Sequence, residues 1–254
     1  MKAMVLAAGL GTRMRHLTVD RPKPMVSVLG RTLIDRTLDR LGEVGVGEAV
    51  VNLHYRPEML RAHLAGRDAP GVVFSDETGL LLETGGGVAK ALPMLGDGPF
   101  MVVNSDTVWI GTDAFVPLTE AWDAETMDAL LLLVPMERAV GYSRAGDFSL
   151  DEPPSVGLEP GPATTRPLPE QAPARGRSGK LVRRGDSPTA PYVFTGAQIL
   201  SPVLFRDVPE GPFSLNLVWD RAIAAGRAFG IVHPGAWCDV GTPEGLAEAE
   251  EALG

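Results

Sequence analysis

Strand-like and helix-like segments alternate along the first part of the chain, and this alternation restricts the possible folds more than any other feature. Apolar runs typical of buried strands occupy residues 3–8, 49–53, 72–74 and 100–104, and helix-like segments occupy 32–44, 57–65 and 87–95. Repeated strand–helix–strand units connect parallel strands. The pattern therefore predicts an α/β fold, with a Rossmann-like, mostly parallel central sheet and helices on both faces. Ligands of such folds bind beyond the carboxyl ends of the strands.

Length and charge narrow the functional classes. The chain has 254 residues, enough for one large core, so residues 1–254 are expected to form a single domain. The formal net charge of −9 argues against a nucleic-acid-binding surface. The one cysteine, Cys238, excludes an internal disulfide, and no apolar run reaches the roughly 18 residues of a membrane span. Because the start of the chain has no cleavable signal pattern, the expected location is the cytoplasm. No membrane association is expected, and no protein partner can be deduced from the sequence.

The loop after the first strand combines glycines with concentrated positive charge. Gly9 and Gly11 lack a Cβ, so the backbone there can bring its N–H groups close to a ligand. Residues 13–23 add four cations against a single anion, namely Arg13, Arg15, Arg21 and Lys23 against Asp20. Backbone donors and fixed cations together hold polyphosphates, so the loop predicts a nucleoside triphosphate ligand. It matches neither the dinucleotide fingerprint nor the P-loop, and the alternative is a glycine turn that is basic by chance.

The segments LAAGLGTRM (6–14) and RPKPM (21–25) resemble the signature of the sugar-1-phosphate nucleotidyltransferases. The resemblance implies that a sugar-1-phosphate oxygen attacks the α-phosphorus of a nucleoside triphosphate, that pyrophosphate leaves, and that no general base is needed. It makes Arg13 and Lys23 the catalytic residues that grip the triphosphate. The nucleotide-binding residues that it implies in this part of the chain are Ala8, Gly9, Gly11, Thr12, Arg13 and Lys23.

Two aspartates are the candidates for holding a metal ion. Asp106 ends the run VVNSD, and Asp239 lies in WCDVGT near the end of the chain. Mg²⁺ takes oxygen ligands, usually one or two carboxylates together with substrate phosphates, although an isolated aspartate more often is solvated or caps a turn. Both segments resemble the two metal-binding segments of the same family, in the same order. The resemblance therefore implies a Mg²⁺ cofactor held by Asp106 and Asp239.

Further segments bear on the base and the sugar. The run LETGGG (82–87) resembles the base-reading loop of the family, which implies nucleotide contacts from Thr84, Gly85 and Gly86. Its alternative is a flexible turn into a helix. Together with the downstream KALP (90–93), this run is similar to the N-acetylmuramate-1-phosphate uridylyltransferases, which salvage a cell-wall sugar. The sugar-binding residues that the resemblance implies are Asn104, Asp147, Thr195 and Gly196.

The resemblance thus implies transfer of a uridylyl group from UTP to N-acetylmuramate 1-phosphate. The rival among enzymes is a mannose-1-phosphate guanylyltransferase or another hexose-1-phosphate nucleotidyltransferase. The rival of another class is a regulatory subunit that only binds a sugar nucleotide. Such a subunit should have lost at least one charged catalytic position, and all of these positions are present: Arg13, Lys23, Asp106 and Asp239.

Residues 151–191 break the alternating pattern. This window holds nine of the 22 prolines and six of the 23 basic residues, and it has almost no apolar periodicity. It predicts either a substrate lid or a disordered loop without function, inserted in the single domain. The family resemblance covers residues 1–150 and 192–250 and leaves this segment out, beside the expected sugar pocket.

Overall fold

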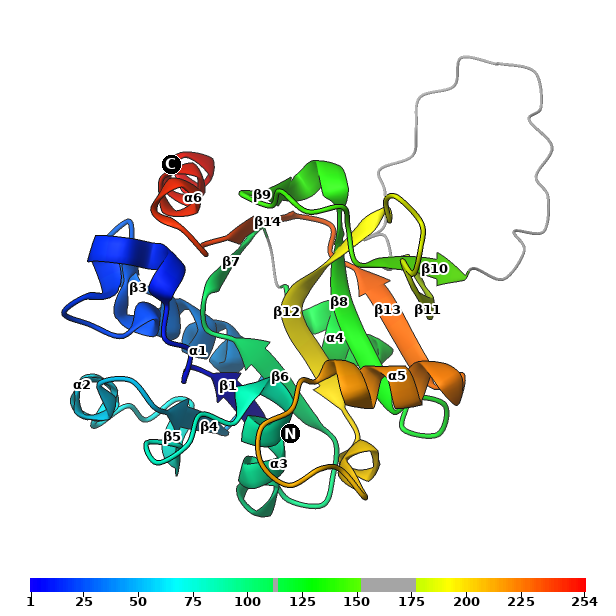
Figure 1. The fold of residues 1–254 in the computed structure, drawn as a ribbon, viewed down its shortest axis with the longest axis horizontal. Helices are drawn as coiled ribbons and strands as arrows, with labels where there is room; N and C mark the ends of the chain where they lie inside the picture. The colour runs from blue at the N-terminus through cyan, green and yellow to red at the C-terminus, as the bar shows by residue number, and fades with distance from the viewer. Residues whose placement is uncertain (112–113, 152–176) are drawn as a thin grey trace.

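A computed structural model of the chain describes residues 1–111, 114–151 and 177–254. Its largest element is a nine-stranded sheet in the order β10-β11-β13-β8-β12-β6-β1-β4-β5 (Figure 1). The strands are β1 (Ala3–Leu6), β4 (Glu48–Leu53), β5 (Gly71–Asp76), β6 (Phe100–Asn104), β8 (Ala129–Pro135), β10 (Phe148–Asp151), β11 (Ser178–Arg183), β12 (Tyr192–Leu200) and β13 (Ala228–Val232).

The remaining elements cover the sheet or extend it at one end. The α-helices are α1 (Leu33–Glu43), α2 (Pro57–Leu64), α3 (Glu83–Leu95), α4 (Val116–Ala121), α5 (Asn216–Ala224) and α6 (Pro243–Leu253). A small second sheet consists of β7 (Thr107–Ile110), β14 (Ala236–Asp239) and β9 (Ala139–Val140), and β2 (Ser27–Val28) pairs with β3 (Arg31–Thr32). Short 3₁₀ helices are η1 (Thr12–Thr18), η2 (Lys23–Met25), η3 (Met136–Arg138) and η4 (Pro202–Phe205). No helix in the described part of the chain is long and apolar enough to cross a membrane.

Strand direction confirms the predicted α/β fold. β5, β4, β1 and β6 are parallel neighbours, and β8 and β13 form a second parallel pair. β12 is antiparallel to both β6 and β8, and β11 is antiparallel to β10 and β13, so these two strands run against the rest of the sheet. The sheet is therefore mostly parallel, with antiparallel insertions in the half that follows β6.

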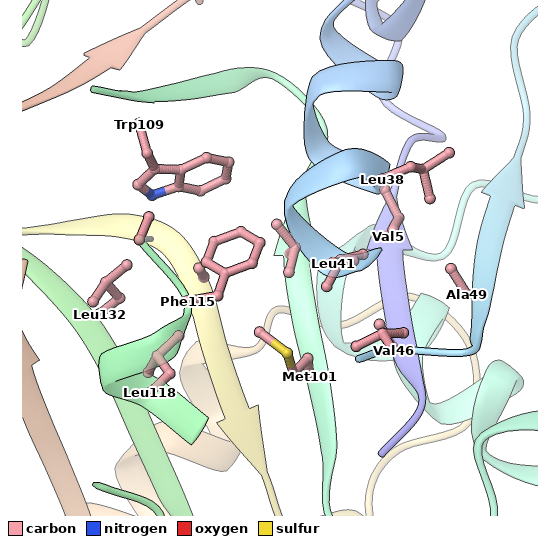
Figure 2. Close-up of a cluster of buried hydrophobic side chains, with 14 of the residues drawn as sticks. Val5, Leu38, Leu41, Val46, Ala49, Met101, Trp109, Phe115, Leu118 and Leu132 are labelled. Atoms are coloured by element: carbon pink, nitrogen blue, oxygen red, sulfur yellow. The ribbon is translucent and has the colours of Figure 1, made fainter. Parts of the chain in front are cut away.

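Helices cover both faces of this sheet, as the sequence predicts. Along β1, Ala3 and Val5 face one core cluster and Met4 faces the other, because successive strand residues point to opposite faces. The first cluster takes apolar side chains from α1, α2 and α4; in Figure 2, Leu38 and Leu41 of α1 lie beside Val5. The second cluster takes apolar side chains from α3 and α5.

One predicted irregular segment is partly a strand. Residues 178–183 form β11, which pairs with β10 and β13, so the expectation of a loop or lid is wrong there. The strand gives a weak sequence signal, because its inward positions are Gly179 and Leu181 and only the leucine is large and apolar. Residues 152–176 of the same predicted segment lie outside the described residues.

Candidate active site

A buried asparagine holds the glycine loop in place. Asn52 on β4 is 2% exposed, and its Oδ1 accepts the backbone N–H groups of Ala7 (2.6 Å) and Ala8 (3.2 Å). Its Nδ2 donates to Oε1 of buried Glu77 (2.7 Å), whose Oε2 accepts the N–H of Leu82 (3.1 Å). The network thus ties the loop after β1 to the segment that begins α3. Asn52 is not among the residues predicted for the site, although a polar residue inside the apolar strand AVVNL is a usable signal.

Replacing Asn52 with leucine is expected to destabilise the fold by about 2–4 kcal/mol. The change leaves two buried N–H groups and a buried carboxylate without their partners, and each unsatisfied buried group costs about 1–3 kcal/mol. Urea denaturation followed by circular dichroism measures the loss. The matched control is Asn216→Leu on the exposed start of α5, which should change the free energy of unfolding by less than about 1 kcal/mol. Equal stability of the two variants would contradict the role of Asn52.

Two neighbouring cavities open at the carboxyl ends of β1, β4 and β6. The first, here called the loop cavity, is lined by Ala8, Gly9, Lys23, Asn52, Thr84, Asn104 and Asp106, among others. The second, here called the aromatic cavity, is lined by Arg13, Asn104, Asp106, Arg144, Asp147, Phe148, Arg183, Phe194, Gly196, Trp219, Trp237 and Asp239, among others. Asn104 and Asp106 line both, so the two cavities adjoin at the end of β6, and together they are here called the cleft.

Lys23 lies at the border of the two cavities. Its side chain is 8% exposed, and Nζ contacts Oδ2 of Asp106 at 2.6 Å. Gly11 makes this placement possible, since it adopts a φ of +63° and a Cβ there would lie 2.9 Å from the Lys23 Cβ. Most of the other cations of the loop are neutralised on the surface, because Arg15 pairs with Glu244 and Arg21 with Asp20. Arg13 has no ion pair with any residue that the structure describes.

Strand pairing brings Asp239 to Asp106. β14 runs antiparallel to β7 with Asp239 opposite Thr107, the residue that follows Asp106. Burial raises the pKa of the Asp239 carboxyl, and the charge of Asp106 raises it further, while the cations Lys23 and Arg13 oppose the shift. A Cβ at Gly241 would meet Oδ1 of Asp239 at 2.8 Å and both terminal nitrogens of Arg13 at 3.1 Å. Two carboxylates and two of the predicted cations therefore meet at the middle of the cleft.

The aromatic cavity contains three of the four predicted sugar residues. Asn104, Asp147 and Gly196 line it. Oδ1 of Asp147 accepts the hydroxyl of Tyr142 (3.1 Å), and Oδ2 accepts the N–H of Phe194 (3.0 Å), so the carboxylate is held in one orientation. Gly196 has a φ of +87°, and a Cβ there would lie 3.0 Å from the Asn104 side chain. It sits where the pairing of β12 with β8 shifts register, a type of irregularity that often lies beside a site.

Comparisons with known proteins decide the family. The MobA-like NTP transferase domain matches residues 3–188. The chain is 42% identical over 258 residues to the N-acetylmuramate alpha-1-phosphate uridylyltransferase of Caulobacter vibrioides, covering 99% of this chain and 96% of that protein. It is 35% identical to the enzyme of the same name from Neisseria meningitidis serogroup B, covering 100% and 99%. The chain belongs to the MobA-like NTP transferase family. Within it, the chain is a sugar-1-phosphate nucleotidyltransferase.

More distant proteins share the fold. Mannose-1-phosphate guanylyltransferase 1 of Arabidopsis thaliana is 29% identical over 255 residues, and the match covers 96% of this chain but 62% of that protein. The structure of a UDP-glucose pyrophosphorylase complexed with UDP-glucose superposes with a TM-score of 0.75 at 17% identity, covering 99% of this chain and 97% of that one. This nucleotidyltransferase thus has the Rossmann-like fold predicted, and the uridylyltransferases are nearer relatives than the guanylyltransferase.

In this nucleotidyltransferase, the two glycines predicted to contact the nucleotide, Gly85 and Gly86, instead pack a helix against a neighbouring segment. Gly85 and Gly86 lie inside α3, which begins at Glu83, and neither lines the loop cavity. The N–H groups of both glycines donate to the Phe213 carbonyl (2.8 and 3.1 Å). A Cβ at Gly86 would lie 2.4 Å from the Gly211 carbonyl oxygen. The glycines allow α3 to pack against the segment before α5. Thr84 lines the loop cavity, whereas Gly11 and Thr12 line neither cavity.

The fourth predicted sugar residue, Thr195, also needs correction. It is fully buried, and its hydroxyl donates to the Leu132 carbonyl on β8 (3.0 Å). Its neighbours Phe194 and Gly196 line the aromatic cavity, but the Thr195 side chain does not. Side chains alternate across a strand, so a residue next to a cavity-lining one points to the opposite face. Thr195 therefore supports the strand from behind.

Replacing Gly86 with alanine is expected to destabilise the protein by about 2–4 kcal/mol, because the new methyl group meets backbone that cannot move aside cheaply. Gly9→Ala is the matched control: nothing lies within 4 Å of a Cβ there, so the stability should stay within about 1 kcal/mol of wild type. Thermal melts of both variants decide the matter. If Gly86→Ala melts like Gly9→Ala, the packing role of this glycine is wrong.

Proposed function

We propose that this nucleotidyltransferase joins UTP and N-acetylmuramate 1-phosphate, giving UDP–N-acetylmuramate and pyrophosphate, in the recycling of a cell-wall sugar. The observation that carries the proposal is that a cavity built on the glycine loop adjoins a cavity with aromatic walls, with Asn104 and Asp106 lining both. The match of 42% identity over 99% of the chain to an N-acetylmuramate alpha-1-phosphate uridylyltransferase, whose name gives the sugar phosphate and the uridylyl group, supports the choice of substrates. The expected location in the cytoplasm stays a prediction from the sequence.

In the proposed reaction, an oxygen of the sugar phosphate forms a bond to the α-phosphorus of UTP, and the bond from that phosphorus to the oxygen that bridges it to the β-phosphorus breaks, so that pyrophosphate leaves with this oxygen. The attacking phosphate is already an anion, so the reaction needs no base, and catalysis is positioning and neutralisation of charge. Lys23 lies at the border of the cavities, where both phosphates must meet. Arg13, which has no ion pair with any residue that the structure describes, neutralises the departing pyrophosphate. Asn104 orients the sugar phosphate.

The residues at the centre of the cleft fit the proposed Mg²⁺ ion. Asp106 and Asp239 line the aromatic cavity together, and the charge of the first affects the pKa of the second. The described residues contain no group of three or more histidine, cysteine, aspartate or glutamate side chains that could hold a metal. Mg²⁺ commonly takes one or two carboxylates and completes its shell with phosphates and water. When bound, the ion would supply positive charge to the phosphates of the two substrates.

A substrate matrix tests the proposal. Pyrophosphate release is measured with each of UTP, GTP, CTP and ATP against N-acetylmuramate 1-phosphate, mannose 1-phosphate and N-acetylglucosamine 1-phosphate, with and without a chelator. UTP with N-acetylmuramate 1-phosphate should give the highest kcat/KM, because a pocket that hydrogen-bonds one base leaves polar groups unpaired with another. The chelator should remove the activity. A preference for GTP with mannose 1-phosphate would overturn the proposal, and pyrophosphate release by none of the pairs would indicate a regulatory subunit.

A further inference from the structure

The aromatic cavity holds more positive charge than the phosphate chemistry uses. Its ionisable lining residues are Arg13, Asp106, Arg144, Asp147, Arg183 and Asp239. Arg13 lies beside Asp239 at the centre of the cleft. Asp147 is held by Tyr142 and by the Phe194 N–H. This leaves two arginines, Arg144 and Arg183, on the sugar side.

Arg183 is already neutralised. Its guanidinium pairs with Asp220 (2.8 Å) and donates to Oδ1 of Asn216 (2.9 Å). It also lies over the rings of Phe148 and Trp219, 5.1 and 5.4 Å from their centroids. These contacts occupy its donors and fix its position. Arg183 is therefore part of the cavity wall.

Arg144 is different, because its guanidinium is positioned but has no anionic partner. It lies in the loop between β9 and β10, and its exposed side chain lines the cavity. The guanidinium carbon is 4.8 Å from the centroid of the Tyr142 ring, and the Tyr142 hydroxyl is anchored on Asp147. Arg144 makes no hydrogen bond or ion pair with any residue in the described ranges 1–111, 114–151 and 177–254. Its N–H donors are therefore available to a ligand.

We propose that Arg144 forms a carboxylate subsite that selects N-acetylmuramate 1-phosphate over neutral sugar phosphates; this inference rests on the proposed function. N-Acetylmuramate is N-acetylglucosamine with a lactic acid ether on O3, so its carboxylate stands away from the phosphate on C1. Of the three lining arginines, Arg13 lies at the phosphates and Arg183 is paired with Asp220, which leaves Arg144 to receive the carboxylate. A guanidinium binds a carboxylate through two parallel N–H···O bonds.

The stacked Tyr142 ring makes the subsite effective. It holds the guanidinium in place before the substrate arrives, so little side-chain freedom is lost on binding. Hydrogen bonds to charged groups contribute enough to change an equilibrium by about 10- to 100-fold. N-Acetylglucosamine 1-phosphate lacks the carboxylate and gains nothing from this contact. Arg144 should thus affect the ratio of the kcat/KM values for the two sugar phosphates more than it affects kcat with either of them.

The test compares kcat/KM for N-acetylmuramate 1-phosphate and N-acetylglucosamine 1-phosphate, each with UTP, in four proteins: wild type, Arg144→Met, Arg144→Lys and Arg183→Met. The ratio of the two values should fall by about 10- to 100-fold in Arg144→Met, mainly through KM for the muramate. Arg144→Lys should recover part of the ratio, since it keeps the charge but not the two-pronged geometry. Arg183→Met, a cavity arginine whose charge is already paired, should keep the wild-type ratio.

Three results would overturn the subsite. The first is an equal loss of both substrates in Arg144→Met, which leaves the ratio constant and assigns the residue a role in the loop alone. The second is wild-type kinetics in Arg144→Met, and the third is an equal fall of the ratio in Arg183→Met. Calorimetric Kd values for UDP–N-acetylmuramate and UDP–N-acetylglucosamine check the ratio without turnover. A wild-type enzyme that does not use N-acetylmuramate 1-phosphate refutes the proposed function itself, which separates that failure from failure of the subsite.

Discussion

Replacing Lys23 with methionine is expected to lower kcat/KM for UTP and N-acetylmuramate 1-phosphate by about 10²–10³-fold, the usual cost of removing one preorganised charge contact to a transition state. Lys23 is almost fully buried at the border of the two cavities, and its Nζ lies 2.6 Å from Asp106. Methionine keeps much of the length of the side chain and removes the charge. Steady-state kinetics with both substrates varied measures the loss.

Stability must be measured beside activity, because the change also removes the ion pair with Asp106. Asp106 is 34% exposed, so water solvates its carboxylate and the expected cost is about 1–2 kcal/mol. Lys2→Met is the matched control: Lys2 also pairs with a carboxylate, Glu48 at 2.7 Å, but lines neither cavity of the cleft. It should keep wild-type kinetics. A folded Lys23→Met variant with near-wild-type turnover would remove Lys23 from the mechanism.

Asp239→Asn is expected to have opposite effects on activity and on stability. Activity should fall by about 10²–10³-fold, because the proposed ion loses a charged ligand. The unliganded protein should melt about 2–4 °C higher at neutral pH, which corresponds to about 1 kcal/mol in a chain of this size. The reason is that burial, reinforced by Asp106, raises the pKa of Asp239, so its ionised form is unfavourable in the folded protein.

The pH dependence has a definite sign. The folded-state pKa of Asp239 lies above its unfolded value of about 3.9. The protonated carboxyl of Asp239 therefore favours the folded state over the unfolded state. This contribution to stability is complete below the unfolded pKa and is lost as the pH rises through the folded pKa. The stability advantage of Asp239→Asn should be absent near pH 3 and largest at neutral pH. Asp20→Asn is the control, because Arg21 lowers the pKa of Asp20 and its loss should not stabilise the protein. A neutral-pH melting temperature below wild type for Asp239→Asn would contradict this account.

Regular alternation made the main architecture predictable. Strands at the start of the chain are short, apolar and separated by segments with helical spacing, so local pattern and tertiary fold agree. β11 escaped prediction because Leu181 is its one large inward-facing residue. A strand with so little apolar periodicity is recognised only through its partners β10 and β13.

The helix α3 begins earlier than the sequence predicts, for a related reason. Glycine is a poor helix former, so local propensity predicts a loop at Gly85 and Gly86. The tertiary structure reverses this, because only glycine fits against Phe213 and Gly211. Contacts between residues so far apart in the sequence cannot be read from a local window.

The contact between residues at the centre of the cleft also could not be predicted from a local window of sequence. The position of Asp106 at the end of β6 places it at the ligand-binding edge of the sheet, but only the family resemblance assigns it a metal. Asp239 reaches Asp106 through the register of β14 on β7, and no property of the segment around Asp239 fixes that register. The family signature supplied this pairing. Asn52 carried a usable signal, a polar residue in a buried strand, since such a residue must have hydrogen-bond partners.

The most direct test of the central claim is a crystal structure of the chain with UDP–N-acetylmuramate and Mg²⁺. The uridine should lie in the loop cavity beside Thr84, and the sugar in the aromatic cavity beside Asp147 and Gly196. The ion should lie at roughly 2.0–2.1 Å from the carboxylates of Asp106 and Asp239, or one water molecule away. A sugar bound outside the aromatic cavity, or either carboxylate turned away from the diphosphate, would contradict the account.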